Sequence, residues 1–237
     1  MIIASNLTKS FGKLKALDDV SLTCTKGECI ALIGPNGSGK TTLIKCILGM
    51  IVPDNGFITF NGKNILRDWE YRKDLGYMPQ IGRYPENMTV EQVIKMIKNI
   101  RRQYNKAFDE ELIEQFQLNK ILKKRMRTLS GGTRQKVSAS LALLFNADVL
   151  ILDEPTAGLD PVSAEIFRKK ITKEKQNGKL IIITSHILSD LDDLVTQVIY
   201  MQEGKLLFHK NLEALRLETG EQRLAKAIAY VMQNNAT

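Results

Sequence analysis

Short runs of apolar residues open the chain and alternate with glycine and lysine. The runs cover residues 2–3, 20–22 and 30–33, and Gly12-Lys13 and Lys26-Gly27 separate them. Runs of this length between turn-forming residues are typical of strands. We therefore predict three short strands, the last of which ends where a glycine-rich stretch begins.

A helix is predicted directly after that stretch. Apolar residues recur there at helical spacing up to Gly49, where a helix would stop: Leu43, Ile44, Ile47 and Leu48. The local order is therefore strand, glycine loop and helix. Residues 57–60 follow as a short predicted strand between turns at 53–56 and 61–62.

The middle of the chain, from about residue 85 to 146, is helical in pattern and rich in Lys and Arg. One amphipathic face is formed by Val90, Val93, Ile94 and Ile97. We interpret this region as an inserted helical lobe. After it, residues 149–152 and 180–184 are uninterrupted apolar runs, typical of strands buried on both faces of a parallel sheet. Residues 160–177 are predicted to form the crossover helix between them.

The last part of the chain predicts a closing hairpin and a helix. The strands of the predicted hairpin are residues 198–201 and 206–208, joined through Glu203-Gly204. In the tail, residues 222–233 place four apolar side chains on one helical face: Leu224, Ala227, Ile228 and Val231. A packing helix is the simplest interpretation, and a dimer or regulatory contact is the alternative.

Composition places the chain among ordinary globular proteins. With 237 residues, 43% hydrophobic and 25% charged, it can bury a sizeable core as one domain. The first residues lack a basic segment followed by a long apolar stretch, so we expect no secretory signal and a cytoplasmic location. The most apolar stretch, residues 137–152, is interrupted by polar residues and falls short of a membrane span.

The number of cysteines and the net charge indicate the redox state of the thiols and the class of partner. Cys24, Cys29 and Cys46 are an odd number with no neighbouring ligand pair, which favours reduced core thiols. The net charge of +8 suggests an anionic partner, which could be nucleotide, a lipid surface or nucleic acid. The basic run at residues 120–127 is open to two interpretations, a solvated face or a contact with anionic lipid.

Residues 34–41 carry the most specific chemistry in the chain. They match the pattern GxxxxGK[ST] between a predicted strand and a predicted helix, where such a loop binds phosphate. Glycines let backbone N–H groups turn inward, and the helix directs its positive end at the anion. Lys40 is expected to reach the β- and γ-phosphates and Thr41 to bind Mg²⁺. The expected nucleotide-binding residues here are Gly34, Pro35, Asn36, Gly37, Ser38, Gly39, Lys40, Thr41 and Thr42.

Two carboxylates follow the predicted strand at residues 149–152. Asp153 and Glu154 stand where ligands collect in open parallel sheets. Asp153 suits the binding of Mg²⁺, directly or through water, and Glu154 suits the orientation or deprotonation of an attacking water.

A second candidate anion site lies at residues 129–135, Leu-Ser-Gly-Gly-Thr-Arg-Gln. Ser130 is predicted to cap a helix whose first residues, Gly131 and Gly132, expose backbone N–H groups. Two such sites in one chain could hold one triphosphate from both sides, whether both come from one molecule or from two.

In their order, these motifs resemble those of ABC (ATP-binding cassette) ATPases. The likeness covers about residues 1–210 and includes the phosphate loop, the LSGG signature, the LDEP strand end, Ala157-Gly-Leu-Asp160 and Thr184-Ser-His186. It implies an α/β fold: a phosphate-loop ABC ATPase core with a mostly parallel sheet and an N-terminal antiparallel β subdomain. A single domain over residues 1–237 would hold the inserted helical subdomain (about 85–146) and a helical tail (about 211–237).

The resemblance also implies roles for individual residues. Two copies would pair head to tail, and Ser130 and Gly132 of one would contact the γ-phosphate of ATP held by the other. Asp160 would link the two sites, and His186 would sense or stabilise the γ-phosphate. Gln80, in Tyr77-Met-Pro-Gln80, would touch Mg²⁺ and water and pass motion to a membrane partner.

Two positions depart from the family pattern. Phe11 stands at the adenine-stacking position, which is usually Tyr, and its ring can stack but offers no hydroxyl. A core aromatic is the alternative for Phe11. Thr133 replaces the usual Gln of the signature, which leaves the anion-binding Ser-Gly-Gly intact.

The predicted function is the ATP-hydrolysing subunit of a transporter, with ATP and Mg²⁺ as cofactors. Its expected partners are a second copy and an integral membrane permease, with no specific nucleic acid, at the inner face of the membrane. A soluble ABC ATPase acting on ribosomes or DNA is the alternative, but this chain has one cassette and no inserted coiled coil. The signature and short tail resemble the exporter-rich ABC-2 group, and residues 77–90 are similar to the ATPase of the copper-processing system that matures nitrous oxide reductase.

Overall fold

A computed structural model describes residues 1–102 and 107–234 of the chain. Residues 103–106, inside the expected helical lobe, and 235–237, at the end of the expected tail, lie outside the described part. The chain forms two compact units, Met1–Tyr71 with Leu180–Thr237, and Arg72–Lys179.

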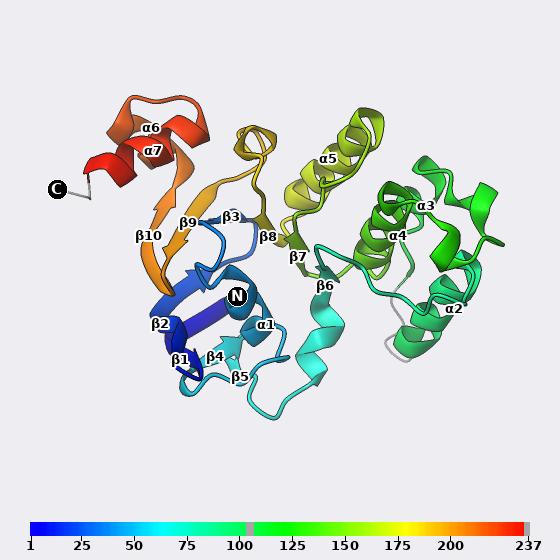
Figure 1. The fold of residues 1–237 in the computed structure, drawn as a ribbon, viewed down its shortest axis with the longest axis horizontal. Coiled ribbons are helices and arrows are strands. Elements are labelled where there is room, and N and C mark those ends of the chain that lie inside the picture. Colours follow the sequence, from blue (N-terminus) through cyan, green and yellow to red (C-terminus); the bar gives the residue numbers. More distant parts are fainter. Residues whose placement is uncertain (103–106, 235–237) are drawn as a thin grey trace. The chain divides into compact units, whose positions relative to one another are not determined.

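The first unit holds most of the strands (Figure 1). Its elements are β1 (Ile2–Phe11), β2 (Leu14–Cys24), β3 (Cys29–Ile33), α1 (Lys40–Ile47), β4 (Asn55–Phe60), β5 (Lys63–Asn64), β8 (Leu180–Thr184), η5 (Leu188–Asp190), β9 (Gln197–Gln202), β10 (Lys205–Asn211), α6 (Leu212–Thr219) and α7 (Leu224–Asn234). The short helix η1 (Glu70–Asp74) crosses the boundary between the units.

Two kinds of strand pairing occur in this first unit. The order β2-β1-β4-β5 forms an antiparallel sheet, and β3 pairs in parallel with both β8 and β9. All five residues of β3 and of β8 are buried, which confirms the strands predicted from those apolar runs. β9 and β10 form the predicted hairpin.

Helix α1 lies where the spacing of apolar residues predicts it. Leu43, Ile44 and Ile47 are buried, the helix ends at Ile47 with Leu48 as its C-cap, and Gly49 follows with a φ of 65°. A left-handed glycine directly after a helix is a common way to end it, because glycine adopts this conformation without strain.

The second unit contains the remaining helices and two strands. Its elements are β6 (Leu75–Met78), α2 (Val90–Arg101), α3 (Glu111–Gln115), η3 (Leu118–Ile121), η4 (Met126–Thr128), α4 (Gly131–Leu143), β7 (Val149–Asp153) and α5 (Pro161–Gln176). β6 and β7 pair in parallel, and β7 is buried along its whole length. The predicted helices of this region are confirmed as α2, α4 and α5.

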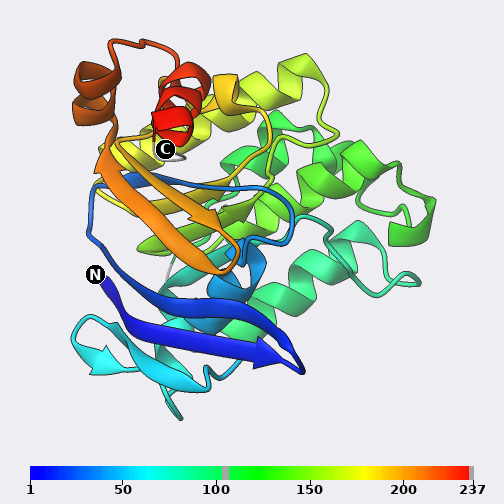
Figure 2. The same cartoon turned by 60° about the vertical axis from the view of Figure 1, so that its left-hand side comes forward.

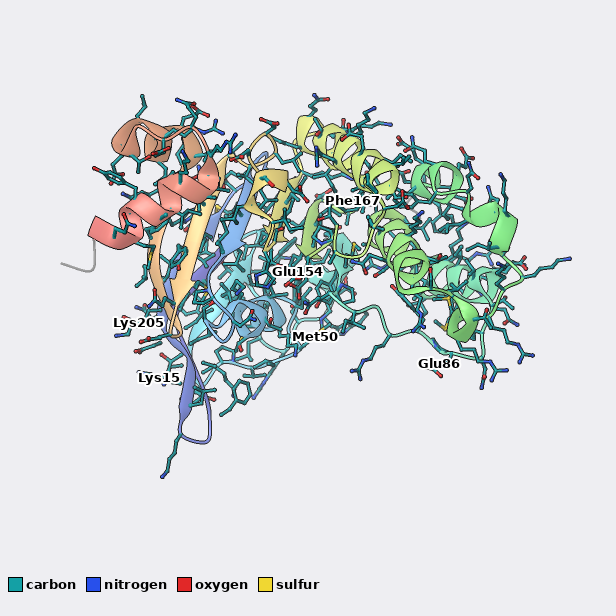
Figure 3. All side chains as sticks on the ribbon, turned by 45° about the horizontal axis from the view of Figure 1, so that its top comes forward. Lys15, Met50, Glu86, Glu154, Phe167 and Lys205 are labelled. Carbon is teal, nitrogen blue, oxygen red and sulfur yellow. The ribbon has the colours of Figure 1, made fainter. Side chains whose placement is uncertain are left out.

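Helix α2 begins with a capping box. The Thr89 hydroxyl accepts from the backbone N–H of Gln92, and the Gln92 side chain accepts from the N–H of Thr89. The basic run at 120–127 lies beside this helix start, because Val90 N–H donates to Lys124 O (3.0 Å) and Arg127 N–H donates to Glu86 O (3.1 Å). Its Lys and Arg side chains are exposed, as is that of Glu86, which Figure 3 labels.

Two expectations about single residue types can be compared with the fold. Cys24, Cys29 and Cys46 are buried and form no disulfide among the described residues, which agrees with the prediction of reduced core thiols. His209 belongs to none of the motifs, which predicts a surface position, but it is half-buried in β10, where burial lowers its pKa. Within the described residues, no helix combines the length and apolar character needed to cross a bilayer.

Candidate functional site

The glycine loop at residues 34–39 joins β3 to α1, as predicted. Gly34 has a φ of 153° and Gly39 a φ of 102°. A Cβ on Gly34 would lie 2.1 Å from the carbonyl oxygen of Met201, and one on Gly39 would lie 2.4 Å from that of Ala16. The glycines therefore allow the loop to pack directly on the backbone of β2 and β9.

Lys40 turns back over this loop from the first position of α1. Its Nζ donates to the carbonyl oxygens of Gly34 (2.7 Å) and Pro35 (2.9 Å). Ser38 is buried, with 1% of its surface exposed. Gly39 offers no side-chain cap to α1, and the first turn of the helix has no acidic residue. A lysine held beside a helix N-terminus that no side chain caps is an arrangement suited to an anion.

The turn between β9 and β10 supports the loop, a role that sequence reasoning missed. Gly204 N–H donates to Ser38 O (3.1 Å), and Asp18 N–H donates to Gly204 O (2.9 Å). The Asp18 carboxylate pairs with Lys15 (2.5 Å) and Lys205 (3.6 Å), both labelled in Figure 3. The hydrogen bond from Lys15 holds the pKa of Asp18 below its usual value. The sequence signals only a hairpin turn here.

Asp153 and Glu154 stand at the carboxyl end of β7. Asp153 is buried, and Glu154, labelled in Figure 3, is half-buried with a φ of 50°. Burial, followed by the negative charge of Asp153, raises the pKa of Tyr77. A positive φ is uncommon for a residue with a side chain, and such conformations gather at functional sites.

The buried side chain of Gln135 reaches this strand end from α4. Its Nε2 donates to the carbonyl oxygens of Glu154 (3.3 Å) and Pro155 (3.4 Å). Ala157 N–H also donates to Glu154 O (3.1 Å). Gln135 belongs to the signature, but the sequence predicts no role for it, because only the fold brings α4 to this turn.

The signature forms a capped helix start, as predicted. Ser130 Oγ accepts from Thr133 N–H (3.3 Å) and lies 2.9 Å from Thr133 Oγ1. The first turn of α4 has no acidic residue, and Ser130 and Gly131 are exposed. A Cβ on Gly132 would lie 2.6 Å from Gly158 O, so the signature packs closely on the turn after β7.

Asp160 caps α5 and forms an ion pair. Its carboxylate accepts from Ser163 N–H (2.9 Å) and Ser163 Oγ (2.7 Å) and lies 2.8 Å from Lys136 Nζ. The bond from Lys136 and then those from Ser163 lower the pKa of Asp160 strongly. Asp160 therefore has a structural role within its own unit, in addition to the role between sites that the family resemblance implies.

Three further candidates lie at strand ends. Phe11 ends β1 with 49% of its surface exposed, so the alternative of a core aromatic is wrong. Lys9 Nζ lies 5.7 Å from the centre of its ring. Gln80 follows β6 and His186 follows β8, and both are exposed.

Parallel pairing brings these candidates together within each unit. In the first unit β3 pairs with β8, so the glycine loop and His186 follow neighbouring strand ends. In the second unit β6 pairs with β7, which places Gln80, Asp153 and Glu154 after neighbouring strand ends. The carboxyl ends of parallel strands are the edge where α/β sheets bind ligands.

Comparison with known proteins agrees with this geometry. Residues 17–157 match the family described as ABC transporter. The chain is 34% identical to the lipopolysaccharide export system ATP-binding protein LptB of Haemophilus influenzae, over 87% of this chain and 89% of that protein. It is also 34% identical to the ABC transporter ATP-binding protein NatA of Bacillus subtilis, over 85% of this chain and 84% of that protein.

Solved structures show the same fold. One, an ATP-binding subunit of an ABC transporter, superposes with a TM-score of 0.88 at 26% identity, over 98% of this chain and 99% of that one. Another is a dimeric ATP-binding cassette in a post-hydrolysis state with ADP and phosphate. It has a TM-score of 0.79 at 23% identity, over 90% of this chain and 99% of that one. The chain therefore belongs to the ABC transporter family, as an ABC-type ATPase.

Proposed function

We propose that this chain works as the ATP-hydrolysing subunit of a transporter, in a head-to-tail pair that drives a separate membrane permease. The observation that carries the proposal is the glycine loop between β3 and α1, with Lys40 held over it at the helix start. The capped N-terminus of α4 is the second anion site that such a pair needs.

The glycine loop binds the triphosphate in this proposal. Lys40 exchanges the carbonyls of Gly34 and Pro35 for the β- and γ-phosphates, to which it is drawn by charge. The N–H groups at the start of α1, including those of Thr41 and Thr42, donate to the same phosphates. Phe11 offers an exposed aromatic face on which adenine can stack.

Mg²⁺ is the metal that the available donors suit. The proposed ligands are the Thr41 hydroxyl, the Gln80 amide oxygen and the Asp153 carboxylate, directly or through water. Among the described residues, no group of three or more His, Cys, Asp or Glu could hold a metal by itself. A few oxygen donors suit Mg²⁺, which completes its shell with water and substrate phosphates. When bound, it offsets the charge that develops on the phosphates.

Hydrolysis then requires a water placed in line with the γ-phosphate. Glu154 orients this water or accepts its proton, and the bonds to its backbone carbonyl hold it at its positive φ. His186 donates to the γ-phosphate from the end of β8, and Gln80 contacts the attacking water.

The second copy completes the site. Ser130, Gly131 and Gly132 of one copy present their hydroxyl and N–H groups to the γ-phosphate bound by the other. Asp160 links the two sites across the pair. A solved cassette with the same fold is dimeric with ADP and phosphate bound, which supports this arrangement.

The membrane partner is the finer part of the proposal. Relatives of this chain are described as serving lipopolysaccharide export and lantibiotic transport, which supports an export system. The proposal of the ABC-2 group, at the cytoplasmic face of the membrane, rests on the resemblance of the signature and tail. A copper-processing system for nitrous oxide reductase maturation is the narrower candidate. Purification of the tagged chain from detergent-solubilised membranes, followed by identification of the hydrophobic protein that accompanies it, tests both. Recovery with polysomes or DNA instead would favour the soluble class.

The hydrolytic role is tested by Glu154→Gln. This change keeps the size of the side chain and removes its basicity, so we expect ATP binding to persist while turnover falls by about a hundredfold or more. Glu165→Gln, on an exposed position of α5, is the matched control. Wild-type turnover in Glu154→Gln would contradict the proposed role.

A further inference from the structure

The segment between β8 and β9 carries His186 near its start and consists of short turns. Asp190 N–H donates to Ile187 O (3.2 Å), and Leu194 N–H donates to Leu191 O (3.0 Å). The long-range backbone bonds of the segment lie at the end away from His186, where Thr196 N–H donates to Cys29 O (2.7 Å) and Leu212 N–H donates to Thr196 O (2.9 Å). The position of His186 therefore depends on what packs against the segment.

Asp192, within this segment, is bound by both C-terminal helices. Arg216 of α6 donates from Nη2 to the backbone carbonyl of Asp192 (3.0 Å). The Asp192 carboxylate accepts from the N–H of Leu224, the first residue of α7 (2.7 Å). Figure 2 shows α6 and α7 following β10 at the end of the chain.

The cap on α7 comes from a distant part of the chain. Arg223 directly precedes α7. Its side chain has no hydrogen-bond acceptor, so it cannot cap the N–H groups in the first turn of α7. Asp192 supplies the acceptor from 32 residues away, and its negative charge also suits a helix N-terminus. Because α7 also packs on η5, the turn two residues after His186, the helix and the segment stabilise each other.

Arg216 is held in one arrangement. Its Nη1 donates to Glu213 (2.9 Å) while Nη2 binds the Asp192 carbonyl, and its Nε is buried without a described partner. A guanidinium fixed at both Nη atoms provides a rigid support, because its planar fork allows little adjustment.

We propose that Asp192 and Arg216 are positioning residues for His186. Through them α6 and α7 hold the β8–β9 segment so that His186 stays beside the carboxyl end of β3. This inference rests on the proposed role of His186 in hydrolysis. It assigns the C-terminal helices a part in turnover, in addition to covering the core.

The test compares turnover and ATP affinity in the purified full chain with its membrane partner. Asp192→Ala removes the cap, and we expect kcat to fall about three- to thirtyfold, the scale of coupling between contacting residues, with the KM for ATP unchanged. Asp192→Asn keeps an oxygen acceptor and should restore most of the activity. Asp193→Ala, an exposed neighbour, is the matched control.

A double mutant separates positioning from plain stabilisation. In a His186→Ala background, Asp192→Ala should lower kcat no further, and backbone amides 185–191 should exchange faster in Asp192→Ala than in the wild type. Arg216→Met provides an independent variant with the same expected signature. If Asp192→Ala lowered kcat by the same factor in the wild-type and His186→Ala backgrounds, the inference would be overturned. A lower Tm with unchanged kcat in Asp192→Ala would also overturn it. Wild-type turnover in His186→Ala would instead contradict the role of His186 itself, and the inference with it.

Discussion

The side-chain amide of Gln135 donates to the backbone carbonyl of Glu154 at 3.3 Å and to that of Pro155 at 3.4 Å. These contacts connect the helix of the signature directly to the proposed catalytic glutamate. Glu154 has a positive φ, and a residue in that conformation persists only where its surroundings hold it. Gln135 is therefore part of what orients the Glu154 side chain.

Replacing Gln135 with Leu tests this connection. The buried Pro155 carbonyl would lose this donor, and the part-buried Glu154 carbonyl would keep only Ala157 N–H, so we expect the free energy of unfolding to fall by about 1–3 kcal/mol. Turnover should fall more than ATP affinity, because the change acts on Glu154 and not on the glycine loop. Steady-state kinetics and urea unfolding measure both effects, with Gln176→Leu, exposed at the end of α5, as control. Unchanged kcat would mean that Glu154 is oriented without Gln135.

The glycine loop predicts a contrast between two glycines. Gly39→Ala places a Cβ 2.4 Å from Ala16 O, whereas Gly37, also at positive φ, has open space around it. We expect Gly37→Ala to cost about 1–2 kcal/mol of backbone strain and Gly39→Ala clearly more, with loss of ATP binding. Urea unfolding and titration with a fluorescent ATP analogue measure these effects. Equal costs at the two positions would contradict the close packing of the loop on β2.

A buried ion-pair cluster around Lys170 predicts a large effect on stability. Lys170 has 1% of its side chain exposed and pairs with Asp109 (2.5 Å), Glu111 (2.8 Å) and Glu174 (2.9 Å). Lys170→Ala leaves the buried Glu174 without this partner, so we expect a loss of about 3–5 kcal/mol. Lys169→Ala, at an exposed neighbouring position, should change stability by less than about 0.5 kcal/mol. Similar midpoints of urea unfolding in both variants would argue against the cluster.

Asp160 predicts a pH dependence of stability. Its pKa is lower in the folded chain than in the unfolded chain, chiefly because of Lys136. The stability that the ionised Asp160 carboxylate gives the folded chain is therefore fully present above the unfolded pKa of about 3.9. It is lost as pH falls toward the pKa of the folded chain. Asn caps a helix as well as Asp does, so Asp160→Asn isolates the charge.

The stability difference between wild type and Asp160→Asn should be constant from neutral pH down to about pH 5 and shrink below about pH 4. Urea unfolding at a series of pH values measures it. The same comparison in a Lys136→Met background should show a smaller difference at every pH. A difference that grows as the solution becomes more acidic would have the wrong sign for a lowered pKa.

The local elements and the class of chemistry could be predicted from the order of the residues alone. Apolar runs buried on both faces identified β3, β7 and β8, because such runs cannot face water. The glycine loop and the Ser130 cap were also predictable, since both depend on residues that are neighbours along the chain. Motif order pointed to the family that the comparisons show.

The support that distant residues give these motifs becomes visible only in the folded chain. Gln135 at the Glu154 carbonyl, Gly204 at Ser38 and Asp192 at the start of α7 are contacts between segments 19 to 166 residues apart. A hydrogen bond to a backbone carbonyl or N–H leaves little trace in the sequence, because every residue carries the carbonyl and nearly all carry the N–H. Which of them meets a given side chain is set by strand pairing and helix packing, and these form only when the whole core is assembled.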